Sequence, residues 1–165
     1  MNIEFNNLEI TKEELASSDR TNPYYVAALY VRVLCSFNNL NQNAFYELMQ
    51  TLLGEYQPLS GIAKQSILDR LMQNNKYEYI GKSYFVGANP SNDYTPSIPY
   101  TVSVMDDPNF NQVGYKRLFL QSGGADSKRP IMLRLAKDGN YYLWSDSYMG
   151  LMTDIRSPES KNPWA

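Results

Sequence analysis

The chain has 165 residues, of which 43% are hydrophobic, and its formal charge at pH 7 is −2. This length and hydrophobic content are typical of one globular domain with a buried core, and the charge provides no basic surface of the kind that binds nucleic acid. Histidine is absent and cysteine occurs once, at Cys35, which excludes histidine-based acid–base catalysis, an internal disulfide and a cysteine–histidine zinc cluster.

The first ten residues alternate loosely between polar and apolar, with Ile3 and Phe5 among the apolar ones, and we expect a short edge strand or an arm over the core. Two glutamates precede the first basic residue, which is not the pattern of a signal peptide. No stretch of about 18 uncharged apolar residues occurs, so we expect no membrane span and a cytoplasmic protein.

Residues 11–75 have the periodicity of helices. Thr11 and Glu14 have the T-x-x-E spacing of a capping box, which predicts a short first helix. Amphipathic spacing predicts two longer helices, over about 43–53 and 60–72.

Another helix is predicted between the short first helix and the helix over 43–53. It starts at Asn22-Pro23, where asparagine caps the helix and proline suits the first helical position. It runs to about Phe37 and contains a single charge, Arg32. Because a helix that is apolar almost all round is normally buried, we expect this to be the central core helix.

From Tyr77 onward the chain has the character of strands separated by turns. We expect strands over 77–86, with Gly81 as a bulge, over 100–104 and over 115–121, followed by a hairpin.

Helices followed by strands, with short connections, predict a single α+β domain over 1–165. We expect the N-terminal helices to pack on one face of a four- to five-stranded antiparallel sheet built by the C-terminal half. The helical part spans about 11–75, the sheet part about 77–146, and an irregular tail 147–165.

The hairpin contains Asp138-Gly139, which favours a two-residue type I′ turn because glycine accepts positive φ freely and aspartate tolerates it. That turn pairs Leu135 with Tyr142 and leaves Arg134 and Tyr141 together on the other, mixed face. The core face of this register holds Ile131, Leu133, Leu135, Tyr142 and Trp144.

The segment Ser122–Arg129 begins with two glycines after the serine and ends in charged residues, which are features of an anion-binding loop. A P-loop requires G-x-x-x-x-G-K-[ST] followed by a helix, whereas here the spacing differs and a strand follows. We therefore favour a hairpin-type connection in which Asp126 caps a turn and pairs with Arg129.

Arg134 and Tyr141 on the mixed face, with Arg129 at its rim, form the binding patch that the pattern favours, because arginine and tyrosine are preferred interface anchors. Tyr94, in the loop over 87–99, and Asp126 complete the candidates. The alternative is that Arg134 only extends over the sheet surface to keep its charge in water. We predict no catalytic residue, no metal ligand and no cofactor.

Several short motifs stand in residues 77–165: YFVGANP at 84–90, YTP at 94–96, PY at 99–100, SGGAD at 122–126, RP at 129–130, the strand with Trp144, and NPWA at 162–165. In these motifs the chain resembles the domain-of-unknown-function family DUF6935. The resemblance implies a bacterial intracellular domain, chiefly from Firmicutes, and brings with it no activity and no functional residue.

Two functions from different classes remain open. The first is a non-enzymatic binding or scaffold module for another protein, acting through the tyrosine-rich sheet face and the loop over 87–99, and it would fail if the protein's own helices covered that face. The second is a small-molecule-binding domain or modest enzyme with a pocket between the helices and the sheet, and a solid core would count against it.

Overall fold

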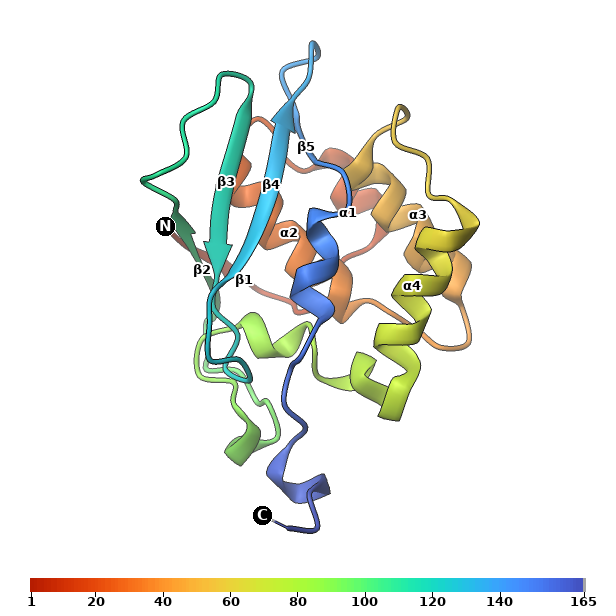
Figure 1. Ribbon diagram of the computed structural model, residues 1–165, viewed down its shortest axis with the longest axis vertical. Coiled ribbons are helices and arrows are strands. Elements are labelled where there is room, and N and C mark those ends of the chain that lie inside the picture. The colour runs from red at the N-terminus through yellow and green to blue at the C-terminus, as the bar shows by residue number, and fades with distance from the viewer. Residues whose placement is uncertain (165) are drawn as a thin grey trace.

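The computed structural model describes residues 1–164, which form four α-helices and a five-stranded antiparallel sheet (Figure 1). The helices lie in the first half of the chain and four of the strands in the second, so the predicted α+β fold is confirmed. The strands, in the order β1-β2-β3-β4-β5 across the sheet, are β1 (Asn2–Phe5), β2 (Tyr100–Asp106), β3 (Tyr115–Leu120), β4 (Arg129–Leu135) and β5 (Tyr141–Leu143). The helices are α1 (Lys12–Ser17), α2 (Pro23–Cys35), α3 (Gln42–Leu53) and α4 (Gly61–Met72).

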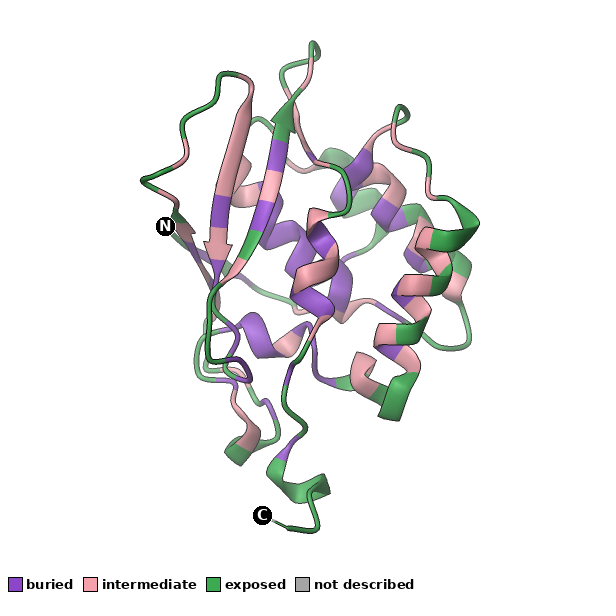
Figure 2. Ribbon diagram, viewed as in Figure 1, coloured by how far each residue is buried: buried purple, intermediate pink, exposed green. Residues whose placement is uncertain are grey.

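Helix α2 is the centre of the structure and lies between the sheet and α3 (Figure 1). The side chain of Asn22 caps it by accepting hydrogen bonds from the backbone N–H groups of Tyr24 and Tyr25, at 3.0 and 3.5 Å. Every residue over 26–34 is buried, and Figure 2 shows the helix as mostly buried. The prediction of a central core helix is therefore confirmed.

The single charge of α2, Arg32, is only 3% exposed and has partners on two preceding segments. Its guanidinium forms an ion pair with Glu14 of α1, at 2.9 and 3.1 Å, and also donates to the carbonyl of Glu9. Thr11 caps α1 as predicted, accepting from the N–H of Glu14 at 3.1 Å. The Glu14 carboxylate, however, pairs with Arg32, so it holds α1 against α2.

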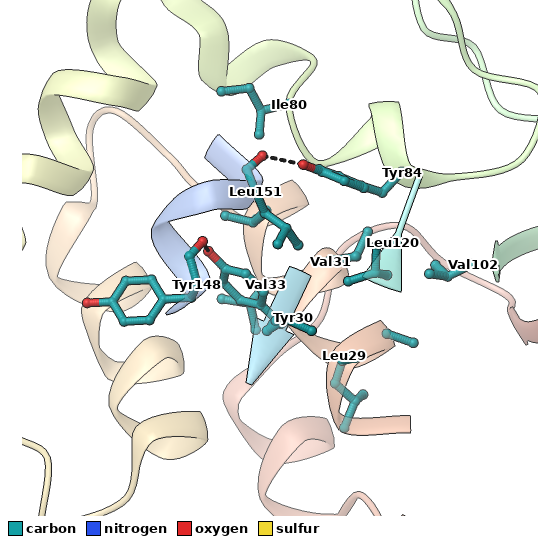
Figure 3. Packing of buried hydrophobic residues seen from close by; sticks show 14 of the residues in the cluster. Leu29, Tyr30, Val31, Val33, Ile80, Tyr84, Val102, Leu120, Tyr148 and Leu151 are labelled. Atoms are coloured by element: carbon teal, nitrogen blue, oxygen red, sulfur yellow. Dashed lines mark hydrogen bonds between the residues drawn. The ribbon is translucent and has the colours of Figure 1, made fainter. Parts of the chain in front are cut away.

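Two buried tyrosines join the 3-10 helix η4 (Ser147–Met152), at the start of the segment expected to be an irregular tail, to the core (Figure 3). The Tyr30 hydroxyl donates to the carbonyl of Tyr148 at 2.9 Å, and the Tyr84 hydroxyl donates to that of Leu151 at 2.6 Å. Both polar tips are thus satisfied inside an apolar environment, which is the condition for burying tyrosine without a large loss of stability.

The predicted strand over 77–86 is wrong. The segment forms two 3-10 helices, η1 (Gln73–Glu78) and η2 (Lys82–Tyr84), and only Phe85 makes a bridge to the sheet, at Val102. The reason is tertiary: the chain passes so close to the end of α2 that a Cβ added at Gly81 would lie 2.6 Å from the backbone nitrogen of Cys35.

The predicted register of the hairpin is wrong by one residue. The loop has three residues, Lys137–Gly139, because the N–H of Ala136 bonds to the carbonyl of Asn140 at 2.9 Å, and Gly139 takes a φ of 85°. The observed pairs are Leu133 with Leu143, Arg134 with Tyr142 and Leu135 with Tyr141. The slip brings Tyr142 to the Arg134 face and moves Tyr141 to the other.

The two glycines of SGGAD serve close packing. A Cβ added at Gly123 would lie 1.9 Å from the carbonyl oxygen of Ala88, and one added at Gly124 would lie 2.1 Å from the Tyr94 hydroxyl. The loop joins the antiparallel neighbours β3 and β4, so the expected hairpin-type connection is confirmed. The expected pairing of Asp126 with Arg129 is wrong, since Asp126 pairs with Arg156 at 2.8 Å.

We expect Gly124→Ala to destabilise the protein by about 2–3 kcal/mol, because the new methyl group would overlap the Tyr94 hydroxyl in a closed core. Urea unfolding followed by circular dichroism measures the change. Gly150→Ala is the control, since no atom lies within 4 Å of its added Cβ, and its effect should stay within about 0.5 kcal/mol. Equal losses in the two variants would contradict the packing argument.

Glu14→Ala should cost about 2 kcal/mol of unfolding free energy, because it leaves the Arg32 charge buried without a carboxylate. The loss is below that of a fully buried pair since Glu14 is itself 47% exposed. The matched control is Glu13→Ala, which removes a neighbouring charge from the same helical turn but no ion pair of the described residues. Equal losses of unfolding free energy in urea would mean that the effect comes from removing a negative charge at the N-terminus of α1, and not from the ion pair with Arg32.

Candidate functional site

An open groove of about 1050 Å³ lies between the β4–β5 hairpin and the end of α3. We call it the hairpin groove. One wall is formed by residues 134–138 with Tyr142 and Trp144, the other by residues 53–57 with Gln50 and Thr51, and one end by Lys12, Arg20 and Glu47. Its rims are exposed: Figure 2 shows the hairpin tip and the loop that follows α3 as mostly exposed.

A few specific contacts hold the two walls at a fixed separation. The amide of Gln57 donates to the carbonyls of Leu53 and Leu143, both at 2.8 Å, and its oxygen accepts from the N–H of Ser145 at 2.8 Å. Gly54, with a φ of 81°, lies against the ring of Tyr142, and an added Cβ would meet that ring at 3.0 Å. The end of α3 is thereby fastened to β5, which makes the groove a rigid feature of the fold.

Arg134 is the most distinctive group of the groove. Its guanidinium carbon lies 4.4 Å from the centre of the Trp144 ring and 5.3 Å from that of Tyr115, and the two rings meet edge to face at 5.8 Å. Among residues 1–164, no ion pair or hydrogen bond of the Arg134 side chain is formed. The structure therefore holds an exposed cation against two aromatic rings and leaves its donors without a partner among the described residues.

The other charges of the groove are mostly engaged. Asp138 accepts a hydrogen bond from the Tyr142 hydroxyl at 2.6 Å, which lowers the pKa of that carboxyl, while burial raises the pKa of Tyr142. Lys12 pairs with Glu47 at 3.3 Å on the surface. Arg20 donates to the carbonyl of Thr51 at 3.1 Å, and its buried Nε has no partner within residues 1–164.

Of the five predicted site residues, the structure places Arg134 in the groove. Tyr141, predicted beside it, lies on the opposite sheet face, partly buried against the core. Sequence reasoning missed Tyr142 and Trp144 as site residues because the two-residue turn assigned them to the core. The sequence signal that could have found them is the alternative three-residue loop Lys-Asp-Gly, a common hairpin loop with glycine in its last position.

The segments that contain the other three predicted residues, 87–99 and 122–129, lie at the opposite end of the molecule from the hairpin tip (Figure 1), and each of the three has partners within the chain. Tyr94 is fully buried, stacks on Tyr79 with ring centres 5.1 Å apart, and donates to the carbonyl of Arg156 at 2.5 Å. Arg129 donates to the carbonyls of Thr153 and Asp154. A second hollow, of about 700 Å³, lies nearby between residues 89–91 and 156–163.

Residues 1–164 bring together no group of three or more His, Cys, Asp or Glu side chains that could hold a metal ion. Burial raises the pKa of the Cys35 thiol to about 12, so this thiol stays protonated at neutral pH. None of the helices in this part of the chain has the length and apolar character needed to cross a membrane.

A family model, described as a domain of unknown function, matches residues 4–159. The chain belongs to the DUF6935 family. The match includes the helices, whereas the resemblance seen in the sequence covered only residues 77–165. It ends before NPWA, whose last residue, Ala165, lies outside the described residues. No curated protein and no solved structure matched the chain.

The motifs that carry the DUF6935 resemblance are, in this chain, packing motifs. YFVGANP, YTP and SGGAD meet one another: Gly123 contacts Ala88, Gly124 contacts Tyr94, and the N–H of Gly123 donates to the carbonyl of Ser83 at 2.8 Å. They build the end of the domain that is remote from the groove, so they account for the fold of this DUF6935 member without indicating what it binds.

Tyr94→Phe should change how stability depends on alkaline pH. Burial raises the pKa of Tyr94 from 10 to about 12. A raised folded-state pKa contributes stability that is fully present below pH 10 and is lost as the pH rises to about 12, because only the unfolded state ionises easily. Removing the hydroxyl should make the loss of stability over this range shallower by about 1.4 kcal/mol per pH unit.

At pH 7 the same variant should lose about 1 kcal/mol, for the hydrogen bond to Arg156. Urea unfolding from pH 7 to 12 measures both effects, and Tyr56→Phe, at a residue 91% exposed, is the control. An unchanged alkaline slope in Tyr94→Phe would contradict the assignment.

Proposed function

We propose that this protein is a non-enzymatic binding module of the bacterial cytoplasm that takes a partner protein in the hairpin groove. The observation that carries the proposal is Arg134, an exposed guanidinium fixed between Tyr115 and Trp144 with no partner among residues 1–164. A charge held in this way contributes little to folding, since its face-on contacts alone are worth about 0.5–1 kcal/mol at an exposed site.

The composition of the groove supports a protein partner. Arginine, tyrosine and tryptophan are the residues that most often dominate binding energy at interfaces, and Arg134, Tyr142 and Trp144 share one wall. Leu135 adds an aliphatic side chain that is 42% exposed. Because the hairpin and Gln57 already hold these groups in place, a partner would bind without a large cost of ordering them.

The face on which Arg134 lies remains partly exposed along β3 and β4, so the condition that would have excluded a binding face is not met. The loop over 87–99 takes no part in this proposal, because it lies at the other end of the molecule. The histidine-free sequence supports binding over catalysis.

The second candidate is a small-molecule-binding domain or modest enzyme. It is favoured by the position of the groove between the end of α3 and the sheet, and by its volume of about 1050 Å³, which is just above the range of about 300–1,000 Å³ for ligand pockets. Native mass spectrometry of the protein purified from its own cells tests it, since a retained small molecule would add a defined mass.

Site-specific photo-crosslinking tests the binding module. A photoreactive phenylalanine analogue at Leu135, inside the groove, should give a discrete adduct with one protein in living cells. The same analogue at Leu40, 94% exposed in the loop before α3 and outside the groove, should not give that adduct. The adduct should fall at least ~10-fold when Arg134→Ala is added, as expected for loss of a hot-spot residue.

Two results would contradict the proposal. Identical adducts from Leu135 and Leu40 would mean general surface reactivity, and a groove adduct unaffected by Arg134→Ala would mean that the observation carrying the proposal is irrelevant to binding.

A further inference from the structure

We infer that the groove binds an extended acidic segment of its partner, and that Arg134 binds a carboxylate of that segment in its guanidinium plane. This inference rests on the proposed function and specifies the chemistry of the partner. It follows from how Arg134 is held, how β5 is closed and how charge is distributed over the two walls.

The first step concerns the free atoms of Arg134. The rings of Trp144 and Tyr115 lie 4.4 and 5.3 Å from the guanidinium carbon, and no acceptor among residues 1–164 takes a hydrogen bond from the group. A guanidinium donates its hydrogen bonds in its own plane, so these donors are available to a partner. A planar carboxylate matches this edge with two parallel hydrogen bonds, and fixing the plane beforehand reduces the entropy lost on binding.

A second arginine on the same sheet face shows what Arg134 lacks. Arg117 lies on β3 with its guanidinium carbon 4.9 Å from the centre of the Phe119 ring. Its charge is already paired, because one terminal nitrogen of the guanidinium forms an ion pair with Asp107. Both arginines therefore lie against aromatic rings. Arg117 is paired with a carboxylate, whereas Arg134, which lines the groove, forms no ion pair with a carboxylate among the described residues.

The second step argues against the commonest way in which a sheet binds a peptide. An added strand needs free N–H and C=O groups along a sheet edge. On β5 the outward N–H of Tyr141 donates to the carbonyl of Arg20 at 2.7 Å, and the outward carbonyl of Leu143 accepts from Gln57 at 2.8 Å. With these two outward groups already engaged, the edge of β5 is poorly suited to strand addition, and the groove favours recognition of a partner through its side chains.

The third step is charge. The hairpin wall presents Arg134 and Lys137, and neither forms an ion pair within residues 1–164. Of the groove's acids, Glu47 is paired with Lys12 and Asp138 accepts from Tyr142, which leaves Glu55 on the far wall. The hairpin wall carries the two cations Arg134 and Lys137 against the one carboxylate of Asp138, a net charge of +1 beside aromatic rings, which favours a peptide that carries acidic residues.

Selection from a displayed library of random dodecapeptides on the full chain tests the inference. Peptides enriched on the wild-type protein should contain more Asp and Glu than the starting library. Synthetic versions are then titrated against ¹⁵N-labelled protein. The Trp144 indole signal should shift, and that of Trp164, the other tryptophan and 92% exposed in the tail, should not.

Arg134→Gln should weaken binding of such a peptide about 10- to 100-fold, the range expected for a hydrogen bond between charged groups. Replacing the key Glu of the peptide by Gln should have a similar effect, and the two changes combined should be much less than additive. Arg117→Gln is the matched control and should leave affinity unchanged.

Three results would overturn the inference: no enriched peptide, enriched peptides without excess acidic residues, or affinity insensitive to Arg134→Gln. If these occur while photo-crosslinking at Leu135 still gives its Arg134-dependent adduct, the groove binds a partner of other chemistry and only the acidic segment is wrong. If the adduct is also missing, the proposed function fails with it.

Discussion

The structure depends on the burial of α2 over its whole circumference. Nine consecutive buried residues, 26–34, cover two and a half helical turns, so no face of the helix is left for water. The sheet covers one side, α3 another, and η1 and η2 much of the remainder, which joins helices and strands from both halves of the chain in one core. The one charge that this burial encloses, Arg32, has to be satisfied locally, and Glu14 and the carbonyl of Glu9 do so. The placement of α1 thus follows from a single arginine on α2.

The elements that the sequence predicts correctly are those whose signals are local. Asn22 before Pro23 and Ser60 before α4 are caps that act within one helical turn, and both helices begin where these residues predict. The segment over 77–86 could not be predicted in the same way. It contains strand-forming aromatic residues, but its conformation is determined by contact with the end of α2 at Cys35, which no local pattern encodes.

The candidate site was predictable only in part, because the pairing of the two hairpin strands is shifted by one residue from the predicted register. Asp138-Gly139 is compatible with a two-residue turn and with the observed three-residue loop, and the choice exchanges the faces of Tyr141, Tyr142 and Trp144. Arg134 was identified because its strand position does not depend on the loop. Its ring partners were missed because one belongs to the other arm of the hairpin and the second, Tyr115, lies on β3. Tyr94 was attractive as an exposed loop tyrosine, whereas its burial depends on Gly124, thirty residues further along the chain.

The same constraint explains why the groove stays open. The tip of the β4–β5 hairpin projects beyond the helices (Figure 1), and Gln57 fastens β5 to the end of α3 just before this projection begins. Because α2 is already buried by the elements around it, its burial does not require a helix over the hairpin tip. Residues 134–138 instead line the open groove. At the other end of the molecule Gly124 and Tyr94 are enclosed by the chain itself. Residues that the fold requires and residues of the proposed binding groove are therefore separated in space, so a change at Arg134 should leave the packed end of the domain intact.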